Sequence, residues 1–120
     1  MTPRKEAVLV RAFVCETDRH DGQPLYKLIV QEALKAGLAG ATVLHGSVGY
    51  RHGIHTELQV DAPGQLPMVI EIVDDEGPVH AFLPTLDRLI GSGLITLEKL
   101  RVMRCGRRVA GSEVPNEPGP

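Results

Sequence analysis

The stretch that decides the fold is AVLVRAFVC at residues 7–15, which is apolar throughout except for Arg11. Its apolar side chains fall on both alternating faces, a pattern typical of a strand that is covered on both sides. A second stretch of this kind, PMVIEIVD at residues 67–74, is interrupted in its middle by Glu71. The two stretches therefore predict central strands of a sheet whose two faces are both buried.

The segments around these strands predict two helices and two more strands. Pro24 favours a helix start, and apolar residues recur at helical spacing until Gly37, so we predict a helix over residues 24–36. A second helix is predicted to start at Pro78, with Pro84 inside it removing one backbone hydrogen bond and bending it. Two further strands are predicted at residues 41–45 and 94–103.

The predicted order is β-α-β-β-α-β, which indicates an α+β fold, a ferredoxin-like βαββαβ sandwich with a four-stranded antiparallel sheet. Its two helices cover only one face of the sheet, although the central strands are apolar on both. We therefore expect a homo-oligomer in which the second face is buried between copies. Arg11 and Glu71 are predicted to pair near that surface; the alternative is that each is exposed at an edge.

Length and charge narrow the possible functions. The chain has 120 residues, a formal net charge of -2 and a pI of about 6.2, so we predict one domain over residues 1–105 and no nucleic-acid partner. Residues 106–120 are rich in Gly, Pro and charge, and we expect a disordered tail there. No apolar stretch approaches the roughly 20 residues of a membrane span, which predicts a cytoplasmic protein without direct membrane insertion.

The cysteines and polar residues near the strand ends give no catalytic pattern. Cys15 and Cys105 should lie at opposite ends of the predicted sheet, out of reach for an intrachain disulfide. The stretch after residue 15 holds Glu16, Asp18 and His20, and we interpret it as a polar loop with a turn before the first helix. We predict that the protein is not an enzyme and has no catalytic residues.

The run HGSVGYRHGIHTE at residues 45–57 allows three interpretations: a metal site, a phosphate-binding glycine loop or a mobile recognition loop. His52 and His55 could supply two zinc ligands, but no cysteine pair or HExxH motif accompanies them. The glycine spacing matches neither the Walker pattern nor GxGxxG. We predict no metal, with His52 and His55 as the alternative, and favour the recognition loop.

Two motifs carry a family resemblance: DRHDGQPLY at residues 18–26 and GLAGATV at residues 37–43. With the surrounding chain, about residues 8–103, they resemble the PII-like domain-of-unknown-function family (domain of unknown function 190). This family belongs to the superfamily of nitrogen-regulatory PII signalling proteins. The resemblance implies a trimer and a long loop between the second and third strands, the T-loop, which contacts a partner protein. It also implies that adenine nucleotides bind between subunits near the loop base, as in true PII proteins.

The resemblance transfers to individual positions. Thr42 is similar to a threonine that contacts adenine, and Gly49 and Tyr50 match the start of the T-loop, where Arg51 replaces a glycine. The candidate ligand-binding residues are Thr42, Gly49, Tyr50, Arg51, Lys99 and Arg101. The candidate partner contacts in the loop are His52, His55, Thr56 and Glu57.

One part of the PII pattern differs. PII proteins carry GDGK before the fourth strand to hold phosphates, and we match it to TLEK at residues 96–99, which keeps Lys99 but lacks both glycines. Glu98 would place a negative charge near a phosphate, so a nucleotide would need a different pose. The positive charge for that pose would come from arginines at positions 19, 51, 101 or 104.

The resemblance implies a homotrimeric PII-like protein, and we expect it to sense a small ligand, such as ADP, ATP or a cyclic nucleotide. It would control a partner through the loop at residues 46–64 by an order-disorder switch. Some family members are encoded near, or joined to, fluoride-exporter proteins, which implies a membrane transport partner. Two alternatives stay open: a metal-binding trimer similar to CutA that uses His52 and His55, and a structural trimer without a small ligand.

Overall fold

The computed structural model describes residues 5–46, 66–103 and 105. The predicted tail at residues 106–120 and nearly all of the predicted loop at residues 46–64 lie outside this part of the chain. The described elements follow in the order β1 (Lys5–Cys15), β2 (Arg19–His20), β3 (Gln23–Pro24), α1 (Leu25–Lys35), β4 (Ala41–His45), β5 (Pro67–Asp74), α2 (Glu76–Leu89) and β6 (Leu94–Val102).

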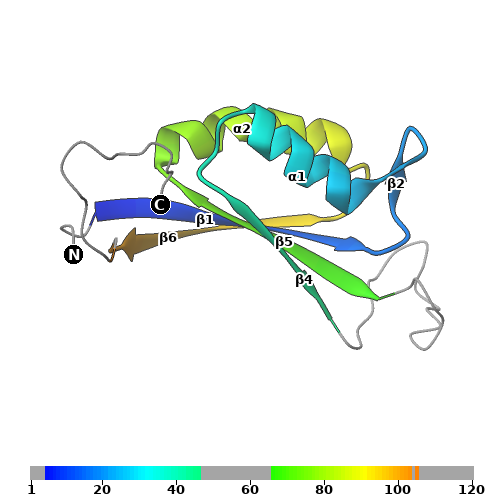
Figure 1. Ribbon diagram of the computed structural model, residues 1–120, viewed down its shortest axis with the longest axis horizontal. Helices are drawn as coiled ribbons and strands as arrows, with labels where there is room; N and C mark the ends of the chain where they lie inside the picture. The colour runs from blue at the N-terminus through cyan, green and yellow to red at the C-terminus, as the bar shows by residue number, and fades with distance from the viewer. Residues whose placement is uncertain (1–4, 47–65, 104, 106–120) are drawn as a thin grey trace.

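The four long strands form one antiparallel sheet in the order β4-β5-β1-β6. Both helices lie on the same face of this sheet, as Figure 1 shows. The two apolar stretches that decide the fold are the two central strands, β1 and β5, and they pair along their length from Val8 opposite Asp74 to Cys15 opposite Pro67. The predicted ferredoxin-like βαββαβ sandwich is therefore confirmed.

The core lies between the sheet and the helices. Residues directly opposite each other in antiparallel strands point to the same face, so β1 and β5 each send every second side chain toward the helices. Met68 and Ile70 of β5 and Ile29 of α1 are completely buried there. The other buried members of this core cluster include Val8, Val10, Ala12, Val14, Ala33, Ile72, Val79, Phe82, Leu86 and Leu89.

The helix boundaries differ slightly from the prediction at the two prolines. Pro24 is the capping residue before α1, with an extended backbone (φ -58°, ψ 123°), rather than the first helical residue. The second helix begins at Glu76, two residues before Pro78. Pro78 fits within the first turn because an N-H at that position has no intrahelical acceptor. Pro84 lies inside α2, as predicted.

A small two-stranded ribbon, β2 with β3, occupies part of the stretch that we interpreted as a polar loop. Its turn is formed by Asp21 (φ 52°) and Gly22 (φ 80°), both in the left-handed region. A two-residue turn with two positive φ angles matches the right-handed twist of a hairpin, and Asp-Gly is a preferred sequence for it. The turn was therefore predicted, whereas its two short strands were not.

The sheet face away from the helices, called the open face here, is covered by none of the described helices and strands (Figure 1). Ala7 and Leu9 of β1 are buried on this side, yet they lie outside the core cluster under the helices. By the strand registers, the open face includes Ala7, Leu9, Arg11 and Phe13 of β1, Thr42 and Leu44 of β4, Val69, Glu71 and Val73 of β5, and Leu94, Thr96, Glu98 and Leu100 of β6.

Candidate functional site

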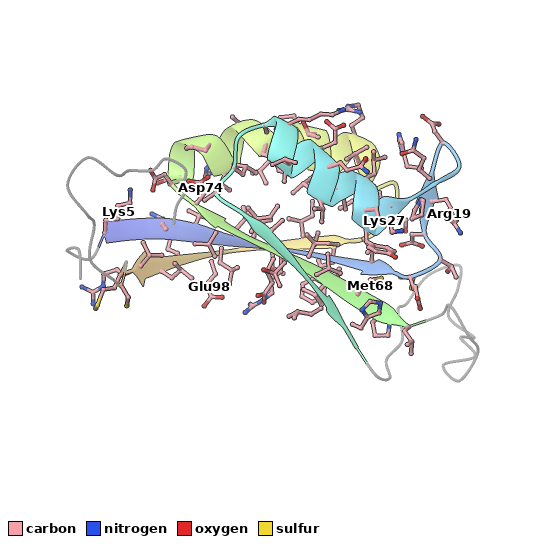
Figure 2. The ribbon with its side chains drawn as sticks, viewed as in Figure 1. Lys5, Arg19, Lys27, Met68, Asp74 and Glu98 are labelled. Carbon is pink, nitrogen blue, oxygen red and sulfur yellow. The ribbon has the colours of Figure 1, made fainter. Side chains whose placement is uncertain are left out.

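The centre of the open face is an ion cluster around Arg11. Its Nε donates to Glu71 Oε2 at 2.9 Å, and its Nη1 donates to Glu98 Oε1 at 3.4 Å. The predicted pairing of Arg11 with Glu71 is confirmed, and the alternative that each is exposed at an edge is wrong, because both lie on central strands. Figure 2 shows Glu98 on the side of the sheet away from the helices.

The third member of this cluster, Glu98, was missed by sequence reasoning. We interpreted Glu98 as a charge beside a bound phosphate, whereas its carboxylate contacts a guanidinium. Glu98 lies opposite Leu9 in the register of β1 with β6, one diagonal step from Arg11. A diagonal contact depends on strand register, and the apolar pattern of β6 does not reveal that register.

The cluster perturbs its cation. The side-chain hydrogen bond that Arg11 donates to Glu71, together with the attraction of the Glu71 and Glu98 carboxylates, raises the pKa of Arg11 above its ordinary value. Because the pKa of Arg11 is raised in the folded protein, its contribution to stability is fully present below the ordinary pKa of arginine and is lost only as the pH rises through the raised pKa. Arg11 therefore stays charged across the neutral pH range.

The described ligand candidates lie at opposite edges of the sheet. Thr42 is exposed on β4, on the open face opposite Glu71. Lys99 and Arg101 are exposed on β6, and by register they point to the helix side of the sheet. Because two strands separate β4 from β6 and the faces differ, one small ligand can contact both groups only where a second copy of the chain supplies one of them.

The other candidate residues fall outside the part of the chain that the structure describes. This applies to the ligand candidates Gly49, Tyr50 and Arg51 and to the loop residues His52, His55, Thr56 and Glu57. It applies also to Arg104, one of the arginines considered for a different nucleotide pose.

The position assigned to the phosphate-binding motif was wrong. Residues 96–99 lie inside β6, which begins at Leu94, so they do not precede the last strand. The turn that does precede it is Gly91-Ser92-Gly93, which contains two glycines in the spacing of GDGK. This turn has glycines where GDGK has them, and Leu94 stands where GDGK has a lysine.

The two glycines of this turn have different surroundings. A Cβ at Gly93 would lie 2.8 Å from Ile90 Cγ2 and 3.1 Å from the carbonyl oxygen of Phe13, so this glycine is needed for close packing. A Cβ at Gly91 would meet no atom within 4 Å. Gly91 thus leaves open space beside the backbone, where an anion could approach the N-H groups of the turn.

Backbone hydrogen bonds fix both ends of the segment between β4 and β5. Gly46 N-H donates to the carbonyl of Pro67 at 2.8 Å, where the chain leaves β4. Glu16 N-H donates to the carbonyl of Leu66 at 2.9 Å, where the chain enters β5. The point of departure and the point of return are therefore both attached to the sheet.

Side chains reinforce the first of these anchors. His45 Nε2 lies 4.0 Å from Glu16 Oε2, and the His45 ring contacts Tyr26 of α1 edge-on with 6.4 Å between centroids. At the end of β4, His45 therefore lies against α1 and close to the residue that follows β1. Among the described residues, no three His, Cys, Asp or Glu side chains gather as a metal site would require. The alternative pair His52 and His55 lies outside these residues.

Cys15 is buried at the end of β1, Cys105 is exposed beyond β6, and no disulfide joins the two, as predicted. No helix within residues 5–46 and 66–103 is long and apolar enough to cross a membrane.

The antiparallel βαββαβ sheet with both helices on one face is a ferredoxin-like fold, and solved structures of PII-like proteins share it. The structure of CPII bound to ADP, AMP and acetate, from Thiomonas intermedia, is similar with a TM-score of 0.63 and 14% identity, covering 86% of this chain and 94% of that one. A PII-like signaling protein from Thermus thermophilus, described as putative, matches with a TM-score of 0.59 and 18% identity, covering 84% and 92%.

Within this class, the sequence identifies the family. The profile of DUF190, described as an uncharacterized ACR, matches residues 7–102. The UPF0166 protein of Aquifex aeolicus is 35% identical over 97 residues, which cover 79% of this chain and 91% of the relative. The UPF0166 protein of Methanocaldococcus jannaschii is 31% identical over 103 residues, covering 82% and 94%. The chain belongs to the DUF190 family.

Proposed function

We propose that the protein is a homotrimeric PII-like regulator that binds an adenine nucleotide between subunits and controls a partner through the segment at residues 46–64. The nucleotide would be ADP, ATP or a cyclic nucleotide. The partner would be a membrane transport protein of the fluoride-exporter type. The regulator itself would catalyse no reaction.

The observation that carries this proposal is the Gly91-Ser92-Gly93 turn before β6. Open space beside Gly91 allows a phosphate to approach backbone N-H groups, which form good anion sites in glycine-rich turns. Lys99 and Arg101 are exposed on the same strand but, at about 3.3 Å per residue, lie on the order of 20 Å from this turn, so they could supply positive charge beside it only from a neighbouring copy. The similar fold of CPII, which was solved with ADP and AMP, supports an adenine nucleotide as the ligand.

The sheet order supports a site between subunits. Thr42 on β4 and the basic residues on β6 lie at opposite edges of one sheet, so a trimer could bring the β4 edge of one copy to the β6 edge of the next. Thr42 also lies on the strand from which the segment at residues 46–64 departs. A nucleotide that contacts this strand would favour one arrangement of the segment, which is how a ligand shifts a conformational population.

Thermal melting of the full chain with ADP, ATP, a cyclic adenine nucleotide and zinc tests the proposal. A ligand that binds only the folded protein stabilises it by about 2.7 kcal/mol at one hundred times its Kd, so an adenine nucleotide should raise the melting temperature by several degrees. Gly91→Val should abolish this rise and leave the unliganded melting temperature nearly unchanged, because no atom lies within 4 Å of the added Cβ.

Three outcomes would contradict the proposal. An equal nucleotide shift in Gly91→Val would show that the turn does not hold the phosphates. The absence of a shift with every nucleotide would leave the structural trimer, and a shift with zinc alone that His52→Ala removes would support the metal-binding trimer.

A further inference from the structure

The open face combines an apolar row with a charged row. Across the four strands, one row consists of Leu44, Val69, Phe13 and Leu94 in register. The adjacent row, two residues along each strand, consists of Thr42, Glu71, Arg11 and Thr96, with Glu98 reaching Arg11 diagonally. A guanidinium and two carboxylates thus interrupt a surface that is otherwise suited to apolar contact.

The cluster contributes little to the single chain. The side chains of Arg11, Glu71 and Glu98 are 38%, 29% and 62% exposed, and ion pairs at such exposure add little stability. Apolar residues at these positions would bury more apolar surface if the face were covered. The charges are therefore better explained by the partner that covers the open face than by the fold of one chain.

The charge distribution indicates that this partner is a second copy of the chain. In a ring of identical copies, each copy meets its neighbours through two patches that must complement each other, and the open face supplies both signs of charge. Each copy carries one cation and two anions in this cluster, so an arrangement that brought carboxylates of different copies together without an arginine between them would be repulsive.

The two carboxylates are held differently. Glu71 accepts from Arg11 at 2.9 Å and lies on a central strand, whereas Glu98 accepts at 3.4 Å from the edge strand β6 and is the most exposed of the three. The shorter contact should persist when copies associate. The longer contact is the one that can be exchanged, because Arg11 has further N-H groups and Glu98 has a second oxygen.

We propose that Arg11 sets the register of the trimer by holding Glu71 of its own chain and binding Glu98 of the neighbouring copy. This inference rests on the trimer proposed above and adds the residues that specify it. A charged contact inside an apolar interface disfavours alternative registers and stoichiometries, since any other arrangement leaves a buried charge unpaired. Arg11 is then a specificity-determining residue for assembly.

The proposal predicts different effects for removing one charge and removing all three. Arg11→Met leaves Glu71 and Glu98 without a cation in the surface that the trimer would bury. Association should therefore weaken at least tenfold. Glu98→Gln should weaken it less. The triple variant Arg11→Met, Glu71→Leu, Glu98→Leu should associate again, but as a mixture of species, because the apolar surface no longer specifies one register.

Sedimentation equilibrium of the full-length variants over a range of concentrations tests these effects, with circular dichroism as the check that each is folded. Lys5→Met is the matched control, because it removes another exposed ion pair of β1, Lys5 with Asp75. We expect one trimeric species for the wild type and for the control. Glu98→Gln cannot fail for lack of folding, since its side chain is mostly exposed in the single chain.

The outcomes separate this inference from the proposed function. A trimeric wild type with unchanged association in both Arg11→Met and Glu98→Gln would overturn the role of the cluster and leave the nucleotide-binding trimer intact. A triple variant that forms one trimeric species as tightly as the wild type would also overturn it. A wild-type protein that stays monomeric at all concentrations would overturn the trimer itself and the register with it.

Discussion

The two faces of the sheet are built from the same kinds of residue but have different surroundings. On β5, Ile70 points to the helices and is completely buried, whereas its neighbour Val69 points to the open face and is half-buried. On β1, Ala12 and Arg11 show the same contrast. The apolar side chains on the two faces of a strand therefore serve two contacts, and only one of them is made among the residues that the structure describes.

Because only one face is covered by helices, the two faces stabilise different states of the protein. Burial against α1 and α2 removes apolar surface from water during folding, so the helix-covered face stabilises the single chain. The open face keeps apolar surface in contact with water until another molecule covers it. Substitutions on the two faces should therefore affect different equilibria: folding on one face and association on the other.

The largest effect is expected from Ile70→Ala on the helix-covered face. Removing a completely buried isoleucine loses its transfer free energy and leaves a cavity, which should lower the free energy of unfolding by about 2–5 kcal/mol. Val69→Ala, one residue along the same strand, should cost only about 1 kcal/mol. Urea denaturation at one fixed protein concentration measures both. Equal losses would show that the two faces are buried alike in the unassociated chain.

An intermediate effect is expected from Leu94→Asp on the open face. Leu94 is 58% exposed, so the substitution should change the unfolding of the single chain by no more than about 0.5 kcal/mol. If the face closes between copies, burying an aspartate in place of a leucine loses about 1.5–3 kcal/mol of apolar burial, which weakens association by at least tenfold. Light scattering across a dilution series measures this, and undiminished association would show that this row stays in water.

The smallest effect is expected from Leu34→Gln on α1. Leu34 is 77% exposed, more than any other large apolar side chain among the described residues, but it belongs to neither face of the sheet. Both the free energy of unfolding, within about 0.5 kcal/mol, and the state of association should stay unchanged. A clear loss of association in this variant would mean that exposure alone, and not the open face, determines where copies meet.

Local patterns predicted most of the fold. The bounds of β4 and β5 follow the predicted residues 41–45 and 67–74, because β-branched runs bounded by turn residues are strong strand signals. The predicted pair of Arg11 with Glu71 also formed, since both interrupt the centre of adjacent strands. The ribbon of β2 with β3 was missed because strands of two residues give no periodic signal.

The candidate site was less predictable. The phosphate motif was placed at residues 96–99 because Lys99 suggested an alignment, whereas the structure shows the matching glycines at Gly91 and Gly93. Motif matching follows residue identity, while the position of a turn relative to a strand follows from where the backbone pairing begins. That pairing starts at Leu94 opposite Phe13, and it decides which residues form the turn.

By itself, the sequence determined the βαββαβ order, the two central strands and the presence of an apolar surface that the two helices do not cover. These features depend on the spacing of apolar, glycine and proline residues along the chain, and such spacing acts locally. Only the tertiary structure decided that Glu98 contacts Arg11, that Gly91 borders open space, and that Thr42 lies at the opposite sheet edge from Lys99. The Glu98 contact depends on the register between strands that are distant in sequence, which local spacing does not specify. The surroundings of Gly91 depend on how the turn packs, and the separation of Thr42 from Lys99 depends on the order of the strands in the sheet.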